Sequence, residues 1–210
     1  MATGQDSEDV RVIALLSGWG CGSTAVAGFL EKCGAFSCPP HWLTNDERTP
    51  VSYEPVALRS ALVSSFDETT LTGLASRSGF APALSRWLAA EKVRAAKQGC
   101  RRIVLKHPLL SLVVRELEDV ASPDFVVVTR RFAAIEATRN RRGWPDVYGA
   151  NGARTLYNAA HVALHEDGIA YLGLPFVAFR RDWALQARLL SHCGLEPDAQ
   201  MLEAARDWLR

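Results

Sequence analysis

The sequence predicts an α/β fold of three layers, in which helices cover both faces of a mostly parallel central sheet. Short apolar runs alternate along the 210-residue chain with longer segments of helical periodicity. Strands of a parallel sheet, buried on both faces, form continuous hydrophobic runs of this kind. The chain has no internal repeat, linker or low-complexity stretch, so residues 1–210 are expected to form a single domain.

The expected elements follow one another regularly. Residues 1–10 are a polar leader that we expect to be flexible. Residues 35–50, rich in proline and cysteine, are an expected irregular loop. Strands are expected at 11–17, 102–105, 124–129 and 175–179. Helices are expected at 24–33, 53–65, 81–98, 109–120, 132–141 and 154–166, followed by two more at the carboxyl end.

Composition limits the classes of partner. Lysine and arginine number 24 against 23 acidic residues, so the net charge of +1 argues against nucleic acid or an anionic membrane. No apolar run approaches the roughly 20 residues that span a bilayer, and the amino terminus lacks the pattern of an export signal. The five cysteines show no CxxC spacing, which argues against a disulfide framework and fits the cytoplasm.

A glycine-rich loop joins the first expected strand to its helix. Backbone N–H groups of such a loop bind anions, and the helix dipole assists them. The Walker pattern of ATPases requires a first glycine and a lysine before the last Ser/Thr, where this chain has Ser17 and Ser23. A glycine turn that only connects two elements is the alternative. The anion-binding candidates are Gly18, Trp19, Gly20, Cys21, Gly22, Ser23 and Thr24.

Two other expected strands end in cationic residues. Lys106 and His107 follow the strand at 102–105, and Arg130 follows the strand at 124–129. Ligands of parallel α/β sheets bind beyond the carboxyl ends of the strands. If the strand order allows, these side chains and the glycine loop therefore meet at one site.

Together these segments resemble the sulfotransferases that use 3′-phosphoadenosine 5′-phosphosulfate (PAPS). Residues 21–24, Cys-Gly-Ser-Thr, are similar to the Ser-Gly-Thr-Ser/Thr core of the loop that holds the 5′-phosphosulfate in that family. Arg130 and, eight positions later, Thr138 resemble the strand-end arginine and helix serine that bind the 3′-phosphate. Residues 105–108, Leu-Lys-His-Pro, resemble the Lys-Asp-Pro or Lys-Thr-His segment, and residues 175–197 are similar to the late strand and helix of bacterial members.

The resemblance implies an enzyme that moves a sulfonate from PAPS to a hydroxyl or amine of a small-molecule or carbohydrate acceptor, with no metal. His107 would be the base and Lys106 would stabilise the transition state. The loop at 18–24, Arg130 and Thr138 would bind the donor. Residues 35–99 match the family least and are expected to form the acceptor side.

One departure keeps two alternatives open. Family loops usually carry Lys or Arg just before Ser-Gly-Thr, whereas Gly20 and Cys21 stand there in this chain. The chain could therefore be a sulfotransferase-like protein that binds without transferring. The other alternative is a small-molecule kinase with a degenerate phosphate loop, against which the missing Walker lysine counts. Lys106 or one of the basic residues in 139–142 could supply the missing cation. That basic run could equally be a solvated helix end.

Overall fold

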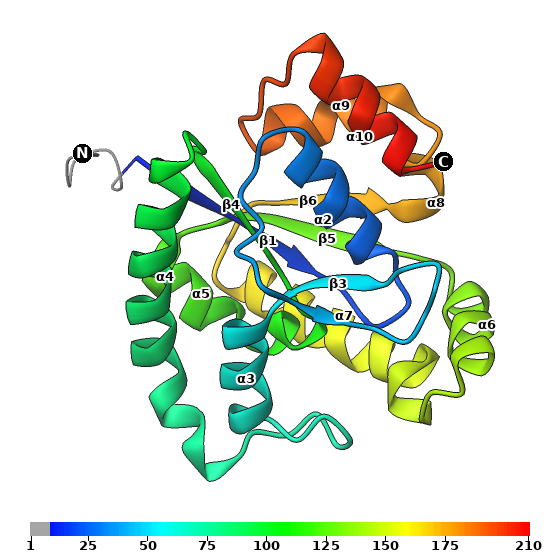
Figure 1. Cartoon of the computed structure of the whole chain (residues 1–210). Coiled ribbons are helices and arrows are strands. Elements are labelled where there is room, and N and C mark those ends of the chain that lie inside the picture. The colour runs from blue at the N-terminus through cyan, green and yellow to red at the C-terminus, as the bar shows by residue number, and fades with distance from the viewer. Residues whose placement is uncertain (1–8) are drawn as a thin grey trace.

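The computed structural model, which describes residues 9–210, confirms the three-layer α/β fold around a sheet of four parallel strands (Figure 1). The strand order is β4-β1-β5-β6, and each neighbouring pair is parallel. The strands are β1 (Arg11–Leu16), β4 (Arg102–Lys106), β5 (Asp124–Thr129) and β6 (Tyr171–Pro175). Because β1 lies between β4 and β5, the loops after these three strands meet at one edge of the sheet.

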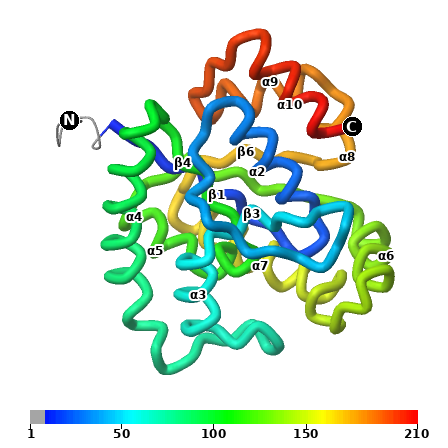
Figure 2. The backbone as a smooth tube through the Cα atoms, viewed as in Figure 1, coloured from blue at the N-terminus to red at the C-terminus, as the bar shows by residue number. Residues whose placement is uncertain are grey.

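Helices cover both faces of the sheet, as Figures 1 and 2 show. One face packs against α3, α4, α5 and α7, and the other against α2, α9 and α10. The helices are α2 (Ser23–Lys32), α3 (Val56–Ser65), α4 (Phe80–Lys97), α5 (Val114–Ala121), α6 (Phe132–Arg142), α7 (Ala150–Glu166), α8 (Phe176–Phe179), α9 (Trp183–His192) and α10 (Ala199–Trp208). Short 3₁₀ helices are η1 (Ala75–Gly79), η2 (Pro108–Leu112) and η3 (Asp146–Tyr148).

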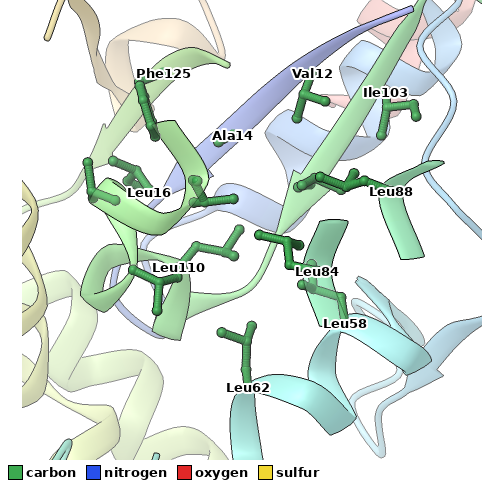
Figure 3. Packing of buried hydrophobic residues seen from close by; sticks show 14 of the residues in the cluster. Val12, Ala14, Leu16, Leu58, Leu62, Leu84, Leu88, Ile103, Leu110 and Phe125 are labelled. Carbon is green, nitrogen blue, oxygen red and sulfur yellow. The ribbon is translucent and has the colours of Figure 1, made fainter. Parts of the chain in front are cut away.

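Two hydrophobic cores lie on opposite sides of β1, because successive side chains of a strand point to opposite faces. Val12 and Leu16 belong to the core beneath α3, α4, α5 and α7, where Leu58 and Leu84 join them (Figure 3). Ile13 belongs to the core beneath α2, α9 and α10. The sheet is therefore packed on both faces. This packing holds the strands in place, and with them the edge of the sheet at which they end.

A second sheet, of two strands, lies where the sequence predicts an irregular loop. β2 (His41–Leu43) pairs antiparallel with β3 (Val51–Pro55). The prediction of a loop at 35–50 is therefore wrong at β2, and the prediction of a helix at 53–65 is wrong for its first three residues, which belong to β3. The strands are short and the chain between them is polar, so the alternation that signals a hairpin is missing. We call residues 41–55 the hairpin and residues 44–50 its tip.

The last strand lies earlier than the sequence predicts. Residues Tyr171–Pro175 form β6, whereas most of the strand expected at 175–179 is the helix α8. Pro175 cannot donate a hydrogen bond to a sheet ladder, and β6 ends there. Phe176 and Phe179 lie three residues apart, at helical spacing, and Phe179 is fully buried while Val177 is exposed. The apolar run therefore packs with a helical period.

Other boundaries differ less. The helix expected at 109–120 is divided at Val113 into η2 and α5, and α7 begins at Ala150, earlier than expected. The leader expected at 1–10 lies mostly outside the described residues, but Val10 is buried. Within residues 9–210, no helix combines the length and the apolar character that crossing a bilayer requires.

Candidate functional site

The strand ends singled out in the sequence converge. The register pairs Leu15 of β1 with Lys106 of β4, and Leu16 with Val127 of β5, so the three strands end at nearly the same level. The loop at 17–24, the residues after β4 and the residues after β5 are therefore neighbours. Arg130, after β5, donates a hydrogen bond to the Gly20 carbonyl, and Ser111, after β4, donates one to the Ser17 carbonyl.

The loop after β1 has the backbone shape of an anion-binding turn. Gly20 and Gly22 have φ values of +71° and +94°, in the left-handed region that favours glycine. A Cβ at Gly22 would also lie 2.4 Å from the ring of Phe176. The helix α2 begins at Ser23 without a side-chain cap and without an acidic residue in its first turn. Its amino-terminal N–H groups and dipole can therefore be directed at an anion.

Side chains of the loop hold its shape. The Ser17 hydroxyl donates a hydrogen bond to the Ser23 hydroxyl over 2.9 Å, and Thr24 donates to the carbonyl of Ser52 in β3 over 3.2 Å. Gly18 lies too close to α7 to accept a side chain. Ser17 and Thr24 use their hydroxyl protons within the chain, whereas Ser23 only accepts, so the loop offers its backbone N–H groups and the Ser23 hydroxyl to a ligand.

Cys21 faces the protein interior. Its side chain is fully buried, and the hydroxyl of Tyr157 lies 2.9 Å from Sγ and 3.0 Å from the carbonyl oxygen of Val128. Burial raises the pKa of the Cys21 thiol to about 11. Cys21 therefore stays a neutral thiol at physiological pH and contributes its backbone, but no charge, to the loop.

Arg130 and Thr138, which the sequence pairs, are in contact. One guanidinium nitrogen of Arg130 donates to Thr138 Oγ1 over 3.1 Å and to the carbonyl of Gly20 over 2.8 Å. The Nε of Arg130 is buried and has no partner among the residues that the structure describes. An unused donor on a partly buried cation is costly, which makes Arg130 a candidate for contact with an anionic group.

Lys106 forms a buried ion pair that the sequence does not predict. Its ammonium donates to Glu54 Oε1 over 2.6 Å and to the Ser52 carbonyl over 3.1 Å. Burial alone would raise the pKa of the Glu54 carboxyl, but the positive charges beside it and the hydrogen bond from Lys106 together outweigh burial, and the pKa lies below its ordinary value. Arg59 of α3 approaches the second carboxylate oxygen at 3.9 Å. Ser52 also accepts from Thr24, which places Lys106 beside the first turn of α2.

His107 lies next to this pair but is enclosed. It is 1% exposed, its Nδ1 accepts the backbone N–H of Leu109 at 3.1 Å, and its Nε2 lies 3.8 Å from Glu54 Oε2. The pKa of His107 falls to about 4, because burial and the charges of Lys106 and Arg59 outweigh the opposing effect of Glu54. The ring is therefore neutral at pH 7. Because Nδ1 is an acceptor, the single ring proton is on Nε2, toward Glu54.

Aromatic side chains form one wall of the site. Trp19, in the glycine loop, stacks on Tyr148 with ring centroids 4.2 Å apart, and Trp144 contacts the same tyrosine edge-on at 6.0 Å. Burial raises the pKa of Tyr148, and the charges of Glu68 and Glu54 add to the effect. The stack therefore lies within electrostatic range of the Lys106–Glu54 pair.

The basic run at the end of α6 is occupied by carboxylates of the chain. Arg139 pairs with Glu136 of its own helix. Arg141 and Arg142 pair with Asp46 in the hairpin tip, over 2.9 and 2.5 Å. In this structure these arginines therefore connect α6 to the hairpin.

Glu54 and Ser52 are the site residues that sequence reasoning misses. Both lie in the hairpin, which was expected to be loop and helix, and Glu54 is 52 residues from Lys106. No spacing in the sequence connects them. The one available signal is that Glu54 is the only charged residue of its segment and precedes a proline. Such a pattern is too common in sequences to identify a site.

Comparison with solved structures shows which proteins share this fold. The sulfotransferase domain of the olefin synthase from Synechococcus PCC 7002 superposes with a TM-score of 0.56 at 17% identity, over 91% of this chain and 75% of that domain. Sulfotransferase STF9 from Mycobacterium avium gives a TM-score of 0.54 at 15% identity, over 98% of this chain and 69% of that protein. The chain thus has the fold of bacterial sulfotransferase domains.

At the level of sequence, no family model matches the chain, and no curated protein matches it. The likeness therefore resides in the arrangement of strands and helices. Among residues 9–210, no three His, Cys, Asp or Glu side chains are arranged to hold a metal ion.

Proposed function

We propose that this protein is a sulfotransferase that moves the sulfonate of PAPS to a hydroxyl or amine of a small-molecule acceptor. The observation that carries the proposal is Arg130. It contacts both Thr138 and the carbonyl of Gly20, and its buried Nε has no partner in the described part of the chain. A guanidinium that connects a strand end, a helix and an anion loop suits a ligand with several anionic groups.

Residues of the chain can hold PAPS as follows. The N–H groups of the loop at 18–24 and the first turn of α2 bind the 5′-phosphosulfate, and Arg130, held by Thr138, binds the 3′-phosphate. The Thr138 hydroxyl already accepts from Arg130 and donates to the Ala134 carbonyl, so its role is to orient the guanidinium. PAPS supplies the sulfonate, whose bond to the phosphate oxygen breaks as the acceptor attacks sulfur.

Lys106 is the cation that compensates for Gly20 and Cys21. Its ammonium and the Thr24 hydroxyl share the Ser52 carbonyl, so it lies beside the helix end at which a sulfonate would be bound. Positive charge at that place stabilises the negative charge that develops on the leaving phosphate oxygen. Its place beside the first turn of α2 supports Lys106 over the arginines of α6, which pair with Glu136 and with Asp46 of the hairpin tip.

The geometry favours Glu54 over His107 as the group that accepts the acceptor's proton. A base needs a free lone pair within reach of the substrate. In His107, Nδ1 is used by the Leu109 N–H and Nε2 carries the ring proton. Glu54 is ionised and 8% exposed, and it lies between Lys106 and His107. His107 and Lys106 are then positioning groups for Glu54.

The transfer balances without a further reactant. The acceptor oxygen or nitrogen forms a bond to sulfur, the sulfur–oxygen bond of the donor breaks, and the acceptor proton passes to Glu54. When the Lys106 ammonium turns toward the sulfonate, it withdraws from Glu54, and the pKa of that carboxyl rises toward a value at which it accepts a proton more readily. The same lysine therefore serves both the leaving group and the base.

The test is the release of radiolabelled sulfonate from PAPS to a panel of small alcohols, phenols, sugars and amines. Wild-type protein should transfer label, and Glu54→Gln, which keeps the shape but removes the base, should reduce kcat about 100-fold or more. Glu47→Gln, an exposed acid in the hairpin tip, is the matched control and should retain activity. Nucleotide binding without transfer to any acceptor would favour an inactive binding protein instead.

A further inference from the structure

The hairpin extends across the edge of the sheet at which the proposed donor site lies (Figures 1 and 2). Its β3 strand is firmly attached there, because Ser52 accepts from Thr24 and Lys106, and Glu54 pairs with Lys106. Ser52, Tyr53 and Glu54 are all buried. This part of the hairpin is therefore part of the site and is held by both polar bonds and burial.

The tip of the hairpin is attached differently. In the tip, Asn45, Glu47, Arg48 and Pro50 are exposed, and Leu43 next to it is 72% exposed. Its attachment to the rest of the chain consists of polar side chains, with little apolar burial. Segments of this kind open locally at a low cost in free energy, whereas buried segments open only with the whole protein.

Asp46 makes that attachment. Its Oδ1 accepts a hydrogen bond from the backbone N–H of Arg48, within the turn, at 3.0 Å. Its Oδ2 forms ion pairs with Arg141 at 2.9 Å and with Arg142 at 2.5 Å. Arg142 also donates to the Thr49 hydroxyl. The Asp46 and Arg142 side chains are only 9% and 16% exposed, so solvent screens this pair less than an ordinary surface pair. The hydrogen bond from Arg141 keeps the pKa of Asp46 below its usual value.

On the side of α6, a chain of contacts leads from Arg142 back to the donor site. Arg142 lies 4.4 Å over the ring of Trp144, which contacts Tyr148, which in turn stacks on Trp19 of the glycine loop. Arg142 is also four residues after Thr138, on the same face of α6. The ionic contact at the tip is therefore continuous with the residues proposed to bind the donor.

We infer that the hairpin tip is a lid over the donor site, and that the ion pair of Asp46 with Arg141 and Arg142 is the latch that must open for nucleotide to enter and leave. The inference rests on the proposed function for the identity of the nucleotide. Arg142 Nε, buried without a partner within residues 9–210, shows that the latch leaves part of its hydrogen-bonding capacity unused. An incompletely satisfied polar contact of this kind is suited to opening and closing.

The first test measures how fast 3′-phosphoadenosine 5′-phosphate (PAP), the nucleotide that PAPS leaves behind, binds and dissociates in stopped-flow fluorescence. Asp46→Asn keeps the size of the side chain and its turn bond but removes the charge. It should raise both the association and dissociation rates about fivefold, from the loss of one partly buried ion-pair cluster, while the equilibrium Kd changes less. Asp46→Glu should restore slow exchange in part, and Glu47→Gln should leave the rates unchanged.

Hydrogen–deuterium exchange tests the latch without any nucleotide. The amide of Thr44 bonds to the Pro50 carbonyl, and that of Thr49 to the Asp46 carbonyl, so both report on the tip. In Asp46→Asn these amides should exchange faster, whereas amides of β3 should not change. Equal exchange in the two proteins, or equal PAP rates, would overturn the latch. Failure of the wild type to bind PAP would contradict the proposed function instead, and exchange would still decide the latch.

Discussion

Arg130 is the residue on which the proposed donor site depends most. One nitrogen of its guanidinium is anchored by Thr138 and Gly20, and its Nε is buried without a partner in the described part of the chain. Arg131, the next residue, is exposed, and therefore offers a control of equal charge at almost the same place.

Replacing Arg130 with alanine should weaken PAP binding about 100-fold, because charge-assisted hydrogen bonds to phosphate contribute about 3 kcal/mol together. Arg131→Ala should change the Kd less than threefold, since an exposed charge is screened. Isothermal titration calorimetry measures both. Equal losses in the two variants would mean that binding depends only on general positive charge.

His107 gives a prediction about stability and pH. Its pKa falls from 6.5 in the unfolded chain to about 4 in the folded protein, because burial disfavours the charged ring. A lowered folded pKa contributes stability above pH 6.5, and that stability is lost as the pH falls toward 4.

The free energy of unfolding in urea should therefore fall between pH 7 and pH 5 more steeply in the wild type than in His107→Gln. Glutamine can still accept the Leu109 N–H but takes up no proton in this range. Parallel curves for the two proteins would show that His107 is not held neutral by its surroundings.

At the scale of elements, the glycine loop shows how backbone geometry sets function. Gly22 has a φ of +94°, and a Cβ there would meet Phe176 at 2.4 Å. Gly143, at the end of α6, also has a positive φ, of +62°, but a Cβ there would meet nothing within 4 Å. Comparing substitutions at these two positions therefore separates the effect of backbone strain from the effect of close packing.

Gly143→Ala should cost about 1 kcal/mol of unfolding free energy and leave PAP binding intact. Gly22→Ala should cost more, on the order of 2 to 4 kcal/mol, and should abolish binding, because either the loop or Phe176 must move. Thermal unfolding and calorimetry measure the two effects. Similar costs with intact binding in both variants would contradict the proposed role of the loop.

The elements show which features the sequence could predict. β1, β4, β5 and α4 follow from unbroken apolar runs and clear helical periodicity, and the loop at 17–24 follows from its glycines. The hairpin could not be predicted, since its strands are short and the chain between them is polar, and with it Glu54 was missed. The strand expected at 175–179 was wrong because an apolar run of five residues fits a strand and a helical turn equally well. The secondary structure of such segments is decided by their contacts with distant parts of the chain and not by their local sequence pattern.

For the molecule as a whole, the near-zero net charge of +1 conceals a local arrangement. Three sources of positive charge lie at one edge of the sheet: Lys106, Arg130 and the first turn of α2. The carboxylate of Glu54, which lies nearby, is bound to Lys106. This local arrangement of positive charge suits the small, highly charged nucleotide that we propose as ligand.

The most direct measurement is a calorimetric titration of the purified protein with PAP, beside an identical titration with ATP and Mg²⁺. The proposal predicts binding of PAP in the micromolar range and markedly weaker binding of ATP, because only PAP carries the 3′-phosphate that Arg130 is placed to receive. No heat of binding with PAP at high micromolar concentration, or tighter binding of ATP with Mg²⁺, would contradict it.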